Sequence, residues 1–89
     1  MTGMSQAKSA IGLQFSLLDG TTAVTNIAVT GIATDDTLIA CLHISTAASI
    51  ATMADILSEV EITSAGNIQL ATTNTTSDQL LLIWNDNSL

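Results

Sequence analysis

The sequence predicts an all-β fold, namely a small antiparallel β-sandwich or barrel of five to six or more short strands. Where a hydrophobic period can be recognised, it is two residues, which is the period of a strand. Turn-forming glycine, asparagine and aspartate residues recur at intervals of roughly 10 residues, as they do in sandwiches and barrels. The chain has 89 residues, of which 47% are hydrophobic and 10% are charged. It is therefore long enough for one small domain and too apolar to be disordered.

Two strands are predicted in the first third of the chain. Residues 13–17 alternate apolar and polar side chains, and a turn at Asp19 and Gly20 ends this strand. Residues 23–32 are rich in β-branched side chains, which favour extended backbone, and Gly31 closes the segment.

The third predicted strand covers residues 37–45 and follows a turn at Asp35 and Asp36. Successive side chains of a strand point to opposite faces of its sheet. The alternation puts Leu38, Ala40, Leu42 and Ile44 on one face, and Thr37, Ile39, Cys41, His43 and Ser45 on the other.

Residues 47–58 fit more than one structure. Their apolar side chains have the spacing of a helical stripe, with a serine where a helix would be capped. The stripe consists of Ile50, Met53, Ala54 and Leu57, and the capping residue is Ser49. One short helix near residues 49–57 is therefore one prediction for this segment, and a loop or an irregular strand is the alternative.

Residues 59–72 predict a β-hairpin. Val60 and Ile62 alternate with Glu59 and Glu61, so the aliphatic side chains are expected to point inward and the carboxylates outward. A Gly-Asn pair in the middle of the segment accepts the positive φ that hairpin turns require. A polar loop is expected after the hairpin.

Residues 79–84 are apolar on both faces, which predicts a central strand or a strand covered by a partner. Leu80, Leu82 and Trp84 share one face of this strand and are the candidate interface residues. The chain has no proline and few charges, so its strand edges lack the residues that usually prevent edge-to-edge pairing. We therefore expect a homo-oligomer.

The charge balance excludes several classes of partner. Lys8 is the only Lys or Arg, against eight Asp and Glu, and the formal net charge is −7. Lys8 lies in residues 1–11, which we expect to form an N-terminal leader or arm before a single β domain at 12–89. Because affinity for nucleic acids comes largely from Lys and Arg, we expect no nucleic-acid partner. No run of 18 apolar residues predicts a membrane span, and no secretory signal begins the sequence, which favours synthesis in the cytosol.

The residues that could carry chemistry are few. Cys41 and His43 lie two apart on one strand, but structural zinc takes four ligands, and with no further Cys or His in the chain only Asp or Glu could complete the set. Neither residue has an evident third group to orient it for nucleophilic catalysis. Asp35 and Asp36 lack the spacing of a calcium loop and are explained by the turn they form. We expect no enzyme activity, no catalytic residues, no cofactor and no metal.

Four segments of the sequence resemble small capsid decoration (cement) proteins of tailed bacteriophages. These segments are residues 29–32 (VTGI), 36–39 (DTLI), 62–70 (ITSAGNIQL) and 78–84 (DQLLLIW). The resemblance covers about residues 23–86 and consists of strand and turn signatures.

The resemblance implies a structural virion protein that binds the major capsid protein and stabilises the phage head. It also implies a place on the outer surface of the capsid after assembly in the host cytoplasm. A trimer is the favoured oligomer, because local three-fold positions recur on icosahedral lattices. Residues 1–11 would then be a capsid-contacting arm. The alternatives are a tail or fibre-associated virion subunit and a glycan-binding β module, and the last of these requires Trp84 to be exposed in a groove.

Overall fold

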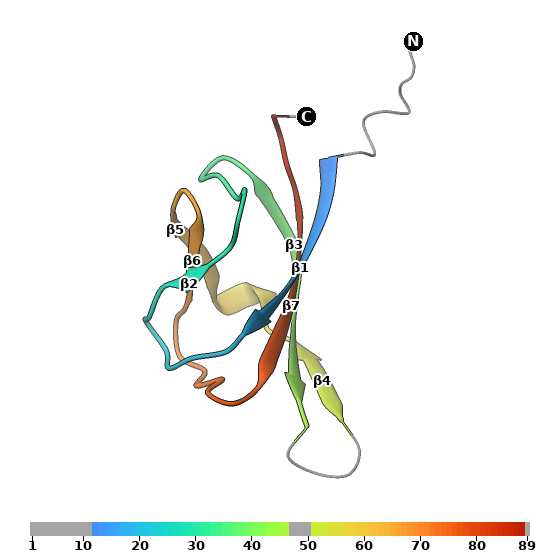
Figure 1. Cartoon of the computed structure of the whole chain (residues 1–89), viewed down its shortest axis with the longest axis vertical. Coiled ribbons are helices and arrows are strands. Elements are labelled where there is room, and N and C mark those ends of the chain that lie inside the picture. The colour runs from blue at the N-terminus through green and yellow to red at the C-terminus, as the bar shows by residue number, and fades with distance from the viewer. Residues whose placement is uncertain (1–11, 47–50, 89) are drawn as a thin grey trace.

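The computed structural model describes residues 12–46 and 51–88. In this part of the chain, seven strands form two antiparallel sheets, with no α-helix (Figure 1). The two sheets lie face to face, which confirms the predicted all-β fold and makes it a small sandwich. The leader predicted at residues 1–11 lies outside the described residues.

The larger sheet has four strands in the order β1-β7-β3-β4. They are β1 (Leu13–Asp19), β7 (Gln79–Asn85), β3 (Thr37–Ser45) and β4 (Thr52–Asp55). Each neighbouring pair is antiparallel. The C-terminal strand β7 lies between β1 and β3, so the prediction of a central strand at residues 79–84 is confirmed.

The smaller sheet has three strands in the order β2-β6-β5. They are β2 (Ile27–Ala28), β6 (Asn67–Leu70) and β5 (Val60–Ser64), and the short 3-10 helix η2 (Leu57–Glu59) leads into β5. Strands β5 and β6 form the predicted hairpin, with Gly66 in its turn at a φ of +85°. The side chains of Val60 and Ile62 pack toward the core, as expected.

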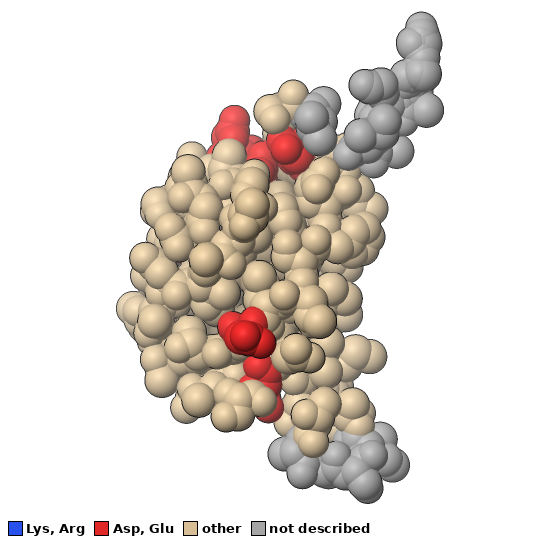
Figure 2. All heavy atoms as spheres, in the orientation of Figure 1, with Lys and Arg blue, Asp and Glu red and all other residues tan. Residues whose placement is uncertain are grey.

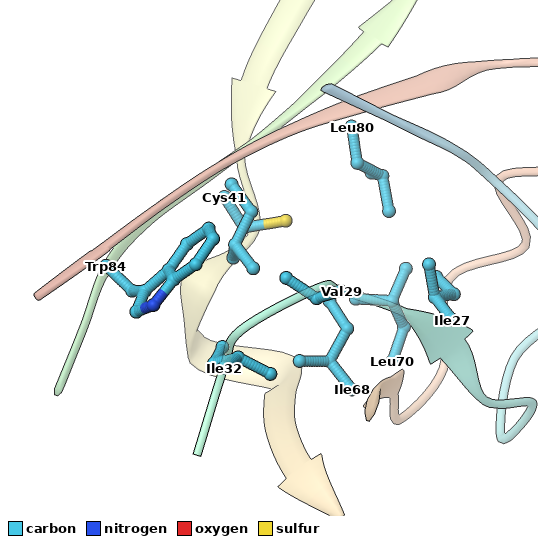
Figure 3. Close-up of a cluster of buried hydrophobic side chains, with 9 residues drawn as sticks. Ile27, Val29, Ile32, Cys41, Ile68, Leu70, Leu80 and Trp84 are labelled. Atoms are coloured by element: carbon cyan, nitrogen blue, oxygen red, sulfur yellow. The ribbon is translucent and has the colours of Figure 1, made fainter. Parts of the chain in front are cut away.

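The core lies between the two sheets (Figure 3). The larger sheet contributes side chains from β3 and β7, and the smaller sheet contributes β2, β6 and the segment after β2. The buried residues are Ile27, Val29, Ile32, Cys41, Ile68, Leu70, Leu80, Leu82 and Trp84. Alternate residues of β7 are buried, so only one face of that strand belongs to this core.

The strand predicted over residues 23–32 is wrong in extent, because only Ile27–Ala28 pairs with a neighbour. Val24 has a positive φ of 56°, which breaks the extended conformation. The β-branched residues Val29 and Ile32 are nevertheless buried. Their composition therefore reflects burial in an irregular segment rather than a regular strand.

Of the alternatives for residues 47–58, the helix near residues 49–57 is wrong where the structure describes that segment, and a strand is found instead. Thr52–Asp55 is strand β4, paired with β3, and residues 47–50 lie outside the described residues. Met53 and Ala54 are exposed, while Ile56 and Leu57 pack against the core. The free edge of β3 gives this segment backbone partners that an isolated short helix would not have.

A bulge in β3 changes the predicted faces of that strand. Leu38 lies opposite Trp84 and Ala40 opposite Ile83, so one extra residue, Ile39, is inserted between them. Leu38 therefore packs toward the core with Cys41. The expectation that Leu38 shares a face with Ala40 is corrected, because the bulge shifts the alternation by one residue.

Candidate functional site: the outer face of the larger sheet

The candidate interface residues Leu80, Leu82 and Trp84 lie in the core. They are 0%, 0% and 3% exposed and belong to the core cluster, and Figure 3 shows Leu80 and Trp84 within that cluster. The second sheet covers the face that they line, so these three side chains pack within the chain rather than on its surface. Leu81 and Ile83 point to the opposite face.

Leu81 and Ile83 lie at the centre of a continuous apolar surface. Phe15 and Leu17 of β1 lie opposite them on one side, and Ala40 and Leu42 of β3 lie opposite them on the other. Ile44 and Met53 form the next pair toward β4. We call this surface the outer face; it consists of Leu13, Phe15, Leu17, Ala40, Leu42, Ile44, Met53, Leu81 and Ile83.

Much of the outer face is open to solvent. Phe15 and Leu17 are each 60% exposed and Met53 is 66% exposed. The smaller sheet lies on the other side of the larger one, and no described segment covers the outer face (Figure 1). Contiguous exposed apolar surface of this kind usually marks a binding site.

Strand β1 is reversed relative to an ordinary surface strand. Its apolar residues Leu13, Phe15 and Leu17 face outward, whereas the polar residues Gln14 and Ser16 lie on the more buried side. A half-buried strand normally turns its apolar side chains to the core. The reversal indicates that both faces of the larger sheet are suited to contact with another surface.

The outer face carries no basic residue and has carboxylates only at its margins. Asp19 ends β1 and Asp55 ends β4. In Figure 2, where the larger sheet is seen edge-on, the visible carboxylates form separate groups with uncharged surface between them. A contact on this face must therefore be mainly apolar.

Cys41 is unsuited to nucleophilic chemistry. Its side chain is fully buried, and burial, together with the nearby carboxylates of Asp55 and Glu59, raises the pKa of the thiol to about 11. The reactive form of cysteine is the thiolate, so this thiol stays protonated and unreactive near neutral pH.

His43 is paired with Asp78 rather than with Cys41. Its Nε2 lies 2.8 Å from Asp78 Oδ2, and both side chains are about one fifth exposed. The pair ties β3 to the loop that precedes β7. Within residues 12–46 and 51–88, no group of three or more His, Cys, Asp and Glu side chains is arranged to hold a metal ion.

Asp36 has a structural role in its turn. Oδ2 accepts a hydrogen bond from the backbone N–H of Ala33, and Oδ1 accepts one from the N–H of Asn87. Both oxygens therefore fix backbone around the turn, in agreement with the interpretation of Asp35 and Asp36 as turn residues.

The sequence alone did not identify the outer face, although a signal for it was present. Residues 13–17 showed the alternation of Leu, Phe and Leu, but alternation does not tell which face is covered. Comparison with known proteins finds no matching family model, no matching curated protein and no matching solved structure. No helix within the described ranges is long and apolar enough to cross a membrane.

Proposed function

We propose that this chain is a structural protein of a virus particle, a decoration (cement) protein that binds the major capsid protein and stabilises the head of a tailed bacteriophage. The observation that carries the proposal is the outer face, a broad apolar surface on a small domain that would otherwise expose it to water. The sequence resemblance to decoration proteins supplies the biological setting.

The chemistry of the chain favours docking over catalysis. The only cysteine is buried and protonated, and the only histidine is paired with Asp78. The described residues include no Lys or Arg. Such a chain acts by binding to another surface. In this proposal that surface is the outside of the capsid.

The two alternatives fare differently. The glycan-binding alternative requires Trp84 to be exposed in a groove, and Trp84 is 3% exposed and belongs to the core. A tail or fibre-associated subunit would use the same outer face with a different symmetry. The number of copies per particle separates the two virion assignments, because decoration proteins cover the head lattice whereas tail components are few.

The test compares two exposed apolar residues on opposite sides of the sandwich. Met53 lies on the outer face and is 66% exposed, and Val24 lies beside the smaller sheet and is 67% exposed. Purified protein carrying Met53→Lys or Val24→Lys is mixed with empty heads assembled from the major capsid protein encoded near this chain's gene. Co-sedimentation then measures binding.

We expect Met53→Lys to weaken head binding by about tenfold, because the substitution places a charge in an apolar contact. Val24→Lys should bind as the unmodified protein does. Failure of the unmodified protein to bind any head would refute the proposal. Equal binding by both variants would show that the outer face is not the docking surface.

A further inference from the structure

Strand β1 forms one of the two edges of the larger sheet, and β4 forms the other. Strand β1 pairs with β7 on one side, and no described strand lies on its other side. This edge is seven residues long and contains no proline and no basic residue. Natural proteins usually protect such an edge with charges, prolines or bulges.

The backbone groups that point out of this edge can be identified from the ladder. Gly12 O accepts a hydrogen bond from Asp86 N at one end of the β1–β7 pair, and Gly20 N donates to Asp78 O at the other end. Hydrogen-bonded and non-hydrogen-bonded pairs alternate along an antiparallel ladder. Even-numbered residues of β1 therefore bond to β7, and the N–H and C=O groups of odd-numbered residues point outward from the edge.

The same three residues thus present both backbone and side chain to a partner. Leu13, Phe15 and Leu17 direct their N–H and C=O groups out of the sheet edge, and their side chains lie on the outer face with 43%, 60% and 60% exposure. A strand added at this edge would gain ladder hydrogen bonds and cover part of the apolar surface in one contact.

We propose that the strand added at this edge is β1 of a second copy of the chain. The two β1 strands pair antiparallel about a two-fold axis at Phe15, with each Leu13 opposite Leu17 of the other copy. In this register every outward N–H and C=O of these three residues meets its counterpart. The result is one eight-stranded sheet with a continuous outer face.

Self-complementarity favours a second copy as the occupant. A two-fold contact brings the same patch of each copy together, and here apolar side chains of similar size lie opposite one another. Residues 13–18 carry no charge, so two chains of net charge −7 can meet at this strand without placing carboxylates in the contact.

The Asp19 carboxylates of the two copies are far enough apart to be screened. Asp19 lies four residues from Phe15, so the two Asp19 residues of the pair are separated by about eight strand residues, or about 27 Å. The Debye length at physiological ionic strength is about 8 Å. Repulsion between these carboxylates is therefore weak.

This pairing does not depend on the proposed capsid function. It uses the edge of the sheet, and it leaves Leu81, Ile83 and the β3–β4 part of the outer face available for another contact. Because a two-fold contact closes on itself, the trimer expected on a capsid lattice would need a separate surface.

The experiment uses purified full-length protein without capsids. Analytical ultracentrifugation over a range of concentrations gives the dimerisation constant of the unmodified chain, Phe15→Lys, Met53→Lys and Val24→Lys. Amide hydrogen exchange, measured at high and low protein concentration, follows the N–H groups of Phe15 and Leu17. The Ser16 N–H, which bonds to β7, is the internal reference.

We expect a dimer that Phe15→Lys weakens by at least about tenfold, because it places two lysines at the centre of the contact. Met53→Lys and Val24→Lys should dimerise as the unmodified chain does. The N–H groups of Phe15 and Leu17 should be protected at high concentration and lose protection on dilution, whereas protection of Ser16 should change little.

Four results would overturn the proposal. The first is a monomer at every concentration, and the second is an oligomer that Phe15→Lys leaves intact. The third is equal loss of association in Phe15→Lys and Met53→Lys, which indicates that outer faces stack on each other instead. The fourth is protection of Phe15 and Leu17 that dilution does not change, because the edge is then covered within one copy.

Discussion

The carboxylate of Glu59 is the most heavily hydrogen-bonded side chain in the described structure. It accepts hydrogen bonds from the backbone N–H and the hydroxyl of both Thr72 and Thr73, at 2.6 to 3.4 Å. These bonds join the end of η2 to the segment after β6. They lower the pKa of Glu59, with the Thr73 hydroxyl as the largest cause. All of them favour the ionised carboxylate.

We predict that Glu59→Gln lowers stability at neutral pH and has a smaller effect in acid. A lowered pKa in the folded state contributes stability above the usual glutamate pKa of 4.5, and this contribution is lost as the pH falls through the folded-state value. The thermal unfolding temperatures of the two proteins should differ at pH 7 and converge as the pH falls below the usual glutamate pKa. A difference that is constant over this range would show that ionisation of Glu59 contributes nothing.

Single residues also mark what sequence can and cannot establish. The sequence predicts no zinc site at Cys41 and His43, because it has no further Cys or His. The sequence does not tell whether the face with Leu80 or the face with Leu81 is buried. An all-apolar strand has no polar residues that indicate its exposed face. In β1 the polar residues would indicate the wrong exposed face, since Gln14 and Ser16 lie on the more buried side.

At the scale of elements, the turn after β1 depends on close contact with the loop before β7. Thr75 is fully buried, and its hydroxyl accepts a hydrogen bond from Thr21 N and donates one to Thr21 O. A Cβ on Gly20 would collide with both the carbonyl and the side chain of Thr75. Position 20 therefore has no room for a side chain.

We predict that Gly20→Ala destabilises the fold by about 1–3 kcal/mol, as overpacking of a tight contact does. Gly66→Ala is the matched control, because no atom lies within 4 Å of its added Cβ and only the φ of +85° opposes the change. That strain costs about 1–2 kcal/mol. Urea unfolding of Gly66→Asn should show partial recovery relative to Gly66→Ala, since asparagine tolerates this conformation. Gly20→Asn should show none, and recovery there would contradict a steric role.

The elements that sequence identified are those with a local signal. The hairpin β5–β6 has alternating side chains and a Gly-containing turn within a few residues. Strand β4 has no such local signal. It is extended because its backbone pairs with β3. Likewise, the β-branched segment 23–32 was predicted as one strand, whereas its burial comes from contacts with the other sheet. Long-range pairing decides both cases.

At the scale of the whole molecule, separate surfaces can serve separate contacts. The free edge of β1 offers backbone groups, and the centre and β4 side of the outer face offer apolar side chains. Neither surface carries a basic residue, and the formal charge of the whole chain is −7. A contact on either surface would therefore rest on apolar burial and backbone hydrogen bonds, and an ion pair there would need a basic residue from outside that surface.

This charge distribution predicts that head binding survives high salt. Salt screens exposed charge contacts, with a Debye length of about 3 Å at 1 M, but leaves apolar burial largely intact. Co-sedimentation with heads in about 0.1 M and 1 M sodium chloride should therefore give similar binding, apart from a modest loss if Asp19 or Asp55 pairs with capsid lysines. Asp55 is unsuitable for substitution because Oδ1 accepts hydrogen bonds from Cys41 N and Leu57 N. Asp19→Asn is the informative variant, since it removes a carboxylate at the margin of the outer face. If 1 M salt or Asp19→Asn released the protein from heads, charge contacts rather than the apolar outer face would hold it there.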